Sequence, residues 1–229
     1  MILYVNGDSH SAGAEAVNDY CFAEDDPFYY NLGRIPHPEN EKVSYGCLIA
    51  NELFAILHCG AEAASSNDRI LRTTRAYIAG GKPNAVIIGW STHERQEWLH
   101  HNTYWQINAG GVGEDWPELV KEKYKFYIAN IDWIMCEQQE HEKIWQFHKE
   151  LQEQEIPHLF FNSFSNFRHI PLQDREDWED CFIEPYNPDM TYYNYLKNQG
   201  FTALPSYHYR ADGHRKWAEF LLPYLTKLL

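Results

Sequence analysis

The chain has 229 residues, a formal net charge of −14, and 44% apolar and 16% aromatic residues. This length and apolar content suit one sizeable α/β domain, which we expect to span residues 1–229. The negative charge argues against a nucleic-acid backbone or an anionic membrane surface as a partner. No apolar run reaches the length of about 18 residues that a membrane span needs, and the first residues lack the features of a signal peptide. We therefore expect a cytoplasmic protein.

The spacing of cysteines and histidines predicts neither disulfides nor a metal site. No CxxC pair occurs, and widely spaced cysteines are typical of free thiols in a reducing compartment. Neither His100-His101 nor the pair His141 and His148 has a spacing typical of metal ligands. We therefore predict no metal and no organic cofactor. The five cysteines are Cys21, Cys47, Cys59, Cys136 and Cys181.

The first residues predict a strand that delivers a serine to a turn. Residues 2–5 are apolar and mostly strand-favouring, and Asn6-Gly7 is a turn signal. Residues 8–10 (Asp-Ser-His) follow, and the small residues after them suit the start of a helix. A strand followed by a sharp turn and a serine is a recurrent way to hold a hydroxyl at the carboxyl edge of a parallel sheet. The alternative is an ordinary helix cap formed by Asp8 or Ser9.

The rest of the chain alternates between strand-like and helix-like patterns. We expect helices over 43–57, 68–79, 116–154 (with room for a break), 189–197 and 211–228, strands over 85–89, 157–162 and 201–204, a short element over 62–68, and irregular segments over 20–42, 96–116 and 163–188. Alternation of this kind predicts a mostly parallel sheet covered by helices on both faces.

Polar side chains follow several of these elements at the point where each ends. In an open parallel sheet, ligands bind beyond the carboxyl ends of the strands. A serine nucleophile there needs a base within hydrogen-bond reach and donors for the developing oxyanion. Together these loops supply candidates for all three roles. They are residues 8–10, 65–68, 91–94 and 162–163, and the group His208, Asp212 and His214 near the start of the last helix.

Two blocks at the ends of the chain resemble one family. Gly7-Asp8-Ser9 follows the first predicted strand, and His208 is followed by a glycine five residues on and a small residue, Ala218, ten residues on. This pattern is similar to the first and last blocks of the SGNH (GDSL-type) hydrolase family. The resemblance implies an α/β fold, namely a three-layer α/β/α sandwich with a mostly parallel, flavodoxin-like sheet.

The resemblance also implies roles for individual residues. Ser9 would be the nucleophile, and its backbone N–H would be one oxyanion donor. Ala64 or Ser65 would supply a second N–H, where the family has a glycine. Ser91 stands where the family has an asparagine whose side-chain amide is a third donor, and Asn67 is a candidate to replace that amide.

The base would be His208, with His214 as the alternate. The family has an acidic residue two or three positions before the histidine, but Pro205 and Ser206 stand there in this chain. The active site would then be a Ser–His dyad, or a triad whose acid comes from elsewhere. The candidate acids are Asp212 and Asp189.

These residues predict a serine esterase that acts on a small-molecule or carbohydrate ester, with an acetyl ester on a carbohydrate as the specific case. The alternative is a catalytically impaired SGNH-like module with a binding or structural role, because two usual helper residues are missing. Domains with such departures resemble some that bacteriophages encode, which would make this a virion-associated protein. Its aromatic segments at residues 28–30 and 104–105 would then be contact surfaces.

Two further patterns remain. Arg69, Arg72 and Arg75 are either the solvated face of their helix or a site for an anionic substrate. The glycine-rich residues 110–113 neither follow a strand nor open a helix, so a phosphate-binding loop is not predicted there. This absence and the negative charge disfavour a nucleotide-binding flavodoxin-like protein.

Overall fold

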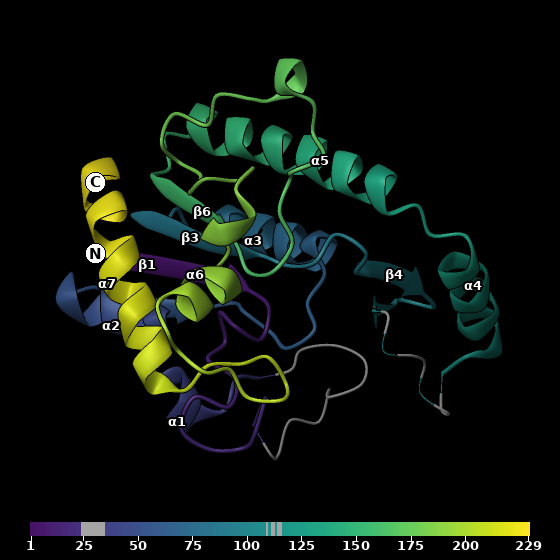
Figure 1. Cartoon of the computed structure of the whole chain (residues 1–229), viewed down its shortest axis with the longest axis horizontal. Helices are drawn as coiled ribbons and strands as arrows, with labels where there is room; N and C mark the ends of the chain where they lie inside the picture. The colour runs from purple at the N-terminus through teal and green to yellow at the C-terminus, as the bar shows by residue number, and fades with distance from the viewer. Residues whose placement is uncertain (24–34, 109, 111–112, 114–115) are drawn as a thin grey trace.

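The computed structural model describes residues 1–23, 35–108, 110, 113 and 116–229. Its main sheet has four strands in the order β2-β1-β3-β6, and each neighbouring pair is parallel (Figure 1). The mostly parallel sheet is therefore confirmed. The strands are β1 (Ile2–Gly7), β2 (Ile56–Cys59), β3 (Ala85–Trp90) and β6 (His158–Asn162).

Helices cover both faces of this sheet, because its central strands are apolar on both sides. Every residue of β3 and β6 is buried. One face packs on α2 (Tyr45–Glu52), α6 (Tyr192–Asn198) and α7 (Ala211–Leu228). The other face packs on α3 (Asn67–Gly80) and α5 (Trp133–Glu153) (Figure 1). This is the three-layer α/β/α sandwich that the sequence predicts.

Shorter helices complete the connections. The long helical region breaks at residues 130–132, where the Asp132 side chain accepts hydrogen bonds from two backbone N–H groups and so caps α5. The remaining helices are α1 (Pro38–Glu41), α4 (Glu118–Ala129) and the 3₁₀ turns η1 (Leu172–Asp174) and η2 (Pro188–Met190).

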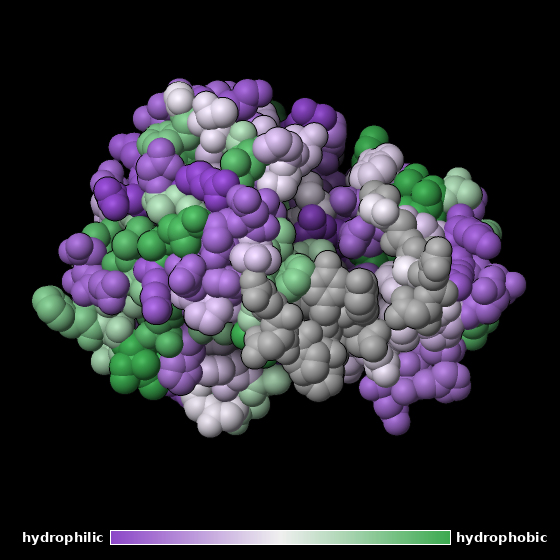
Figure 2. Space-filling view, turned by 90° about the horizontal axis from the view of Figure 1, so that it is seen from below, coloured by the Kyte–Doolittle hydropathy of each residue, from purple (hydrophilic) through white to green (hydrophobic). Residues whose placement is uncertain are grey.

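The loop predicted over 96–116 is wrong in its first half. Strands β4 (Gln96–His100) and β5 (Thr103–Ile107) form an antiparallel hairpin there. His101 and Asn102 both have positive φ, +47° and +62°, as a two-residue hairpin turn requires. Trp98 and other aromatic residues of the hairpin pack on α4 in a separate core. Figure 2 shows this lobe at the right, set off from the larger body by a furrow.

Other predicted elements also differ, and no separate short element forms over 62–68, because residues 62–66 are irregular and α3 begins at Asn67. The predicted helix over 43–57 ends at Glu52, because Phe54 turns the chain with a φ of +50° and Ile56 then pairs with β1 as an edge strand. The segment 201–204 forms no strand, and its apolar side chains pack on the α6 and α7 face instead. No helix follows Ser9; residues 9–16 form consecutive turns.

Two absences can be stated for the described part of the chain. No helix there is both long enough and apolar enough to cross a membrane. None of the five cysteines forms a disulfide bond with another described residue.

Candidate active site

A sharp turn at the end of β1 holds Ser9 at the carboxyl edge of the sheet. A Cβ atom on Gly7 would lie 2.7 Å from the Gly89 carbonyl oxygen and 2.1 Å from Ser11 Oγ, so only glycine fits. Asp8 Oδ1 then accepts a hydrogen bond from the His10 N–H at 3.0 Å, and its C=O accepts one from Ala12 N. The turn is therefore built by backbone contacts on both sides of Ser9.

The histidine ahead of α7 reaches this serine across the whole sequence. His208 Nε2 lies 2.8 Å from Ser9 Oγ. Only 10% of the His208 side chain is exposed. The backbone C=O of His208 accepts a hydrogen bond from Leu204 N, which closes the loop that carries the ring. This distance from ring nitrogen to hydroxyl lies within the hydrogen-bond range that a nucleophile and its base require.

The acid beside this histidine is Glu15, which sequence reasoning missed. Its carboxylate contacts His208 Nδ1 and accepts a hydrogen bond from the Ser206 hydroxyl. Glu15 adopts a φ of +59°, and Arg210 Nη1 donates to its backbone C=O at 2.8 Å. The loop is thus clamped in a conformation that non-glycine residues rarely take.

The acids considered from sequence lie elsewhere. Asp212 Oδ1 accepts a hydrogen bond from Gly213 N in the first turn of α7, so it acts as a helix-terminus acid. Asp189, which is exposed in η2, accepts a weak hydrogen bond through Oδ1 from Asn198 at the end of α6. Within the described chain, neither carboxylate forms a hydrogen bond or an ion pair with His208, so Asp212 and Asp189 do not fit the orienting role.

The alternate base, His214, is buried in the helix layer rather than at the pocket. Its ring stacks on Tyr45, and its Nε2 lies 3.5 Å from the Tyr192 hydroxyl. It has no hydrogen bond to Ser9 in the part of the chain that the structure describes. Burial lowers the pKa of His214 to about 3, so it stays neutral. The geometry thus favours His208 over His214.

Two backbone N–H groups near Ser9 are candidate oxyanion donors. Ser65 N already donates to the Glu62 C=O at 3.2 Å, so Ala64 and not Ser65 is the candidate for the second backbone donor. The N–H groups of Ser9 and Ala64 have no hydrogen-bond partner among the described residues. Ala64 has a φ of +62°, a backbone conformation that glycine adopts more readily than other residues.

The side-chain donors expected from sequence are engaged in other hydrogen bonds. Asn67 Oδ1 accepts a hydrogen bond from Ser91 N at 2.8 Å, and its Nδ2 faces the Ser91 C=O at 3.5 Å. The Ser91 hydroxyl donates to Asp8 Oδ2 at 3.2 Å. Ser91 is fully buried and does not line the pocket. Asn67 and Ser91 therefore lie beneath the pocket, where they hold each other and Asp8, and neither offers a free hydrogen-bond donor to a ligand.

Arg95, which the sequence analysis did not single out, places a positive charge beside Ser91 and Asp8. Arg95 Nη1 donates to Ser91 Oγ at 2.9 Å and lies 3.6 Å from Asp8 Oδ2. Its side chain is 22% exposed and lines the same pocket as Ser9. A positive charge is thus present beside the position that lacks the family's amide. A signal existed in the sequence, since Arg95 closely follows the end of β3.

The pocket around Ser9 has a volume of about 390 Å³. Burial lowers the pKa of His10 to about 4, so its ring is a neutral wall beside His208. Phe164 and Tyr207 are partly exposed at the mouth, with 36% and 58% of their surface accessible. The residues that line the pocket are Asp8, Ser9, His10, Thr92, Arg95, Phe164, Ser206, Tyr207 and His208.

The remaining sequence expectations lie away from this pocket. Arg69, Arg72 and Arg75 each pair with a glutamate at 2.6–2.7 Å, so they form no free anion site. Trp105 is buried against Trp116 and is not a contact surface. Residues 28–30, 111 and 112 lie outside the described part of the chain.

No family model and no curated protein sequence matches the chain. Among solved structures, TesA is similar over 100% of both chains, with 11% identity and a TM-score of 0.56. The acetyl xylan esterase Est2A from the rumen bacterium Butyrivibrio proteoclasticus matches 99% of this chain and 63% of its own, at 12% identity and a TM-score of 0.44. LAE5, an alpha/beta hydrolase enzyme from the metagenome of Lake Arreo in Spain, matches 100% and 96%, at 11% identity and a TM-score of 0.48.

At these identities a structural likeness shows the fold alone. The match to TesA is the one whose TM-score exceeds 0.5 among these three, and it spans both chains completely. The parallel main sheet of this chain and the two helix layers that cover it form a three-layer α/β/α sandwich. This chain therefore shares its fold with TesA, and the three-layer α/β/α sandwich that its end blocks predict is confirmed.

Proposed function

We propose that this chain is a serine hydrolase of the SGNH type that cleaves an ester. The observation that carries the proposal is the line of contacts from Ser9 Oγ to His208 Nε2, at 2.8 Å, and from His208 Nδ1 to the Glu15 carboxylate. The three groups come from two loops at the same edge of the sheet. A nucleophile, a base and an acid that orients the base are the parts that a serine hydrolase requires.

In the first half of the reaction, Ser9 Oγ attacks the ester carbonyl carbon. Its proton passes to His208 Nε2, and Glu15 stabilises the resulting imidazolium through Nδ1–H. The N–H groups of Ser9 and Ala64 donate to the oxyanion. The tetrahedral species collapses, the bond from carbon to the leaving oxygen breaks, and His208 gives its proton to the departing alcohol. An acyl ester on Ser9 remains.

Water completes the cycle by the same groups in reverse. His208 Nε2 takes a proton from a water molecule, whose oxygen attacks the acyl carbon. The second tetrahedral species then breaks its bond to Ser9 Oγ, which recovers the proton from His208. The products are a carboxylic acid and the free enzyme, so no cofactor is needed to balance the reaction.

Arg95 supplies a positive charge that replaces the absent asparagine amide in part. It is held by Ser91 Oγ and Asp8, and its Nε and Nη2 have no hydrogen-bond partner among the described residues. A fixed cation beside a developing negative charge lowers the barrier, because the low-dielectric pocket strengthens their attraction. Arg95 therefore takes part in transition-state stabilisation.

The pocket favours a small acyl group. Its volume is about 390 Å³, and His10 and Phe164 narrow the space beside Ser9. Phe164 and Tyr207 offer ring faces at the mouth on which a sugar can pack. An acetyl ester on a carbohydrate therefore stays the specific substrate prediction.

An ester assay tests the proposal. We expect the wild type to hydrolyse p-nitrophenyl acetate faster than the octanoate ester, and Ser9→Ala to abolish both reactions. A matched control is Ser165→Ala, since Ser165 lines a neighbouring pocket and not this one. A fluorophosphonate probe should label the wild type and the control but not Ser9→Ala. Equal rates for the wild type and Ser9→Ala would contradict the proposal.

One observation favours a second candidate function. Both side chains that could replace the family's amide donor, Asn67 and Ser91, are tied to other partners. A catalytically impaired module with a binding or virion-associated role would show such a loss. Folded wild type that neither hydrolyses esters nor reacts with the fluorophosphonate probe would support this second function.

A further inference from the structure

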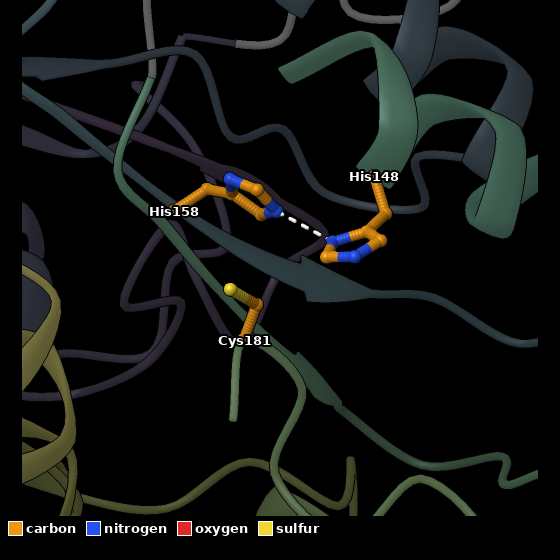
Figure 3. A group of neighbouring side chains, drawn as sticks. All are labelled: His148, His158 and Cys181. Atoms are coloured by element: carbon orange, nitrogen blue, oxygen red, sulfur yellow. Dashed lines mark hydrogen bonds between the residues drawn. The ribbon is translucent and has the colours of Figure 1, made fainter. Parts of the chain in front are cut away.

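Two histidines and a cysteine meet inside the protein, away from the pocket. His148 lies on α5, His158 opens β6, and Cys181 lies in the segment that runs beside β6 (Figure 3). All three are buried, and their ligand atoms lie within 4.8 Å of one another. This group, the His–His–Cys cluster, occupies the amino-terminal edge of the sheet, whereas Ser9 lies at the carboxyl edge.

The two imidazoles point their ring nitrogens at each other. His148 Nδ1 lies 2.8 Å from His158 Nε2, as the dashed line in Figure 3 shows. His158 Nδ1 faces the backbone carbonyl of Ile156 at 2.8 Å. Because a carbonyl can only accept, Nδ1 carries the proton and Nε2 presents its lone pair toward His148 and Cys181. A second hydrogen bond that fixes the tautomer is typical of metal-ligating histidines.

The ligand types in the cluster match one class of cation. Two neutral imidazoles and one thiolate are the donors that zinc and other thiophilic metals prefer. A hard cation such as Mg²⁺ or Ca²⁺ is disfavoured, because no carboxylate from the described residues belongs to the cluster.

We propose that His148, His158 and Cys181 bind one Zn²⁺ ion. Tetrahedral bonds of about 2.0–2.1 Å to nitrogen place two ligand nitrogens about 3.3 Å apart. The observed 2.8 Å therefore needs an opening of about half an ångström. Cys181 Sγ, which donates to the Glu179 C=O at 3.6 Å, must turn toward the rings. On coordination the thiol gives up its proton, the His148 proton moves from Nδ1 to Nε2, which has no hydrogen-bond partner among the described residues, and water fills the fourth position.

A zinc ion here would act on structure rather than on catalysis. It would join α5, the first residue of β6 and the segment around residue 181. That segment already meets β6 through the parallel bridge between Phe160 and Phe182, and the ion would add a link from both to α5. Binding to the folded chain alone stabilises that chain by mass action. The ion therefore ties down the long irregular segment between β6 and α6.

The competing description is a metal-free N–H···N hydrogen bond within an aromatic core. His148 stacks on Trp145 with ring centroids 5.1 Å apart. In that description Cys181 is a buried thiol, and burial raises its pKa to about 11. If that description holds, the Cys181 thiol does not contribute to metal binding, and replacing Cys181 leaves the affinity for Zn²⁺ unchanged.

Metal binding to the full-length protein decides between the two descriptions. We expect chelator-treated wild type to take up about one equivalent of Zn²⁺ on equilibrium dialysis, and its Tm to rise. Cys181→Ser should bind at least about 100-fold more weakly. Two controls should bind like the wild type: Cys136→Ser, another buried thiol, on α5, and His100→Ala/His101→Ala, a pair at the hairpin turn. Loss of uptake in the second control alone would identify adventitious surface binding and overturn the proposal.

Cobalt substitution keeps the test decisive if a variant fails to fold. Co²⁺ bound to a thiolate gives a charge-transfer band in the near ultraviolet, which Co²⁺ bound to imidazoles alone does not. Wild type with this band, absent from His158→Gln or Cys181→Ser, supports the cluster. Wild type that takes up less than about a tenth of an equivalent of Zn²⁺, or that shows no thiolate band, overturns the proposal.

Discussion

The two sides of the Ser9 pocket differ in how completely they are built. On one side, Ser9, His208 and Glu15 form an unbroken line of contacts, although Glu15 and His208 are 193 residues apart. On the other side, Asn67 and Ser91 use their polar atoms to hold each other and Asp8. Under the proposed function, the nucleophile side therefore holds a candidate nucleophile, base and acid, whereas the oxyanion side has no free side-chain amide among the described residues.

This difference indicates which groups of a serine hydrolase site can be supplied from another position in the fold. An orienting acid needs only to reach one ring nitrogen, so a loop near the serine can supply it as well as the loop near the histidine. An oxyanion donor must point at one place in the pocket, which few backbone positions allow. Under the proposed function, Arg95 therefore supplies a positive charge at this place instead of a second amide.

The largest effect should come from His208→Ala on the complete side. Without its base, Ser9 keeps its proton, and we expect kcat for p-nitrophenyl acetate to fall about 10⁴-fold or more. Added imidazole should restore part of the rate, because it can enter the vacated space. The exposed His101→Ala is the control and should keep the wild-type rate. Undiminished activity in His208→Ala would remove the basis of the comparison.

Glu15→Gln should have the next largest effect. The amide keeps the shape of the side chain but no longer stabilises the imidazolium, and we expect kcat to fall about 10²- to 10⁴-fold with little change in KM. Asp212→Asn serves as the matched control, since Asp212 accepts a hydrogen bond from its own helix terminus. If Asp212→Asn were the more damaging change, the orienting acid would be Asp212 after all.

Much of this arrangement could be predicted from sequence, and its limits are physical. The apolar runs of β3 and β6 and the periodicity of α3, α5 and α7 predict the sandwich, because burial on both faces demands them. The hairpin at 96–107 was missed, since its turn uses His101-Asn102 rather than a glycine. The single-domain extent and the cytoplasmic location stay predictions.

The site was predictable where motifs carry it and not elsewhere. Ser9 and His208 belong to blocks with fixed spacing, so the sequence alone marks both as candidate site residues. Glu15 stands among small residues that suggest a helix start, and only the fold places it beside His208. His158 and Cys181 come from separate elements, so no sequence spacing announces their cluster.

Arg95→Ala tests the oxyanion side of the Ser9 pocket, which has no free side-chain amide. Loss of the cation removes one source of transition-state stabilisation, and we expect kcat to fall about 10- to 100-fold while KM changes little. Arg95→Lys should recover part of this loss, because the charge returns without the guanidinium geometry. The control is Arg75→Ala, whose guanidinium pairs with Glu150 at the surface. An unchanged kcat in Arg95→Ala would show that backbone N–H groups suffice.

The smallest expected effect is on stability, and it distinguishes the buried His214 from the proposed base His208. Burial lowers the pKa of His214 to about 3, whereas an unfolded histidine titrates near 6.5. The unfolded chain therefore takes up the proton first, and the stability due to neutral His214 is present above pH 6.5. As the pH falls below 6.5, His214 lowers the free energy of unfolding by about 1.4 kcal/mol per pH unit.

His214→Phe keeps a ring against Tyr45 and removes this titration. We expect the variant to retain ester hydrolysis near pH 7.5 and to lose less stability than the wild type between about pH 7 and pH 5, as measured by urea unfolding. Other buried histidines, such as His93, keep their own acid sensitivity, so the variant should flatten the pH dependence without abolishing it. A variant inactive at pH 7.5 but fully folded would instead return His214 to the active site.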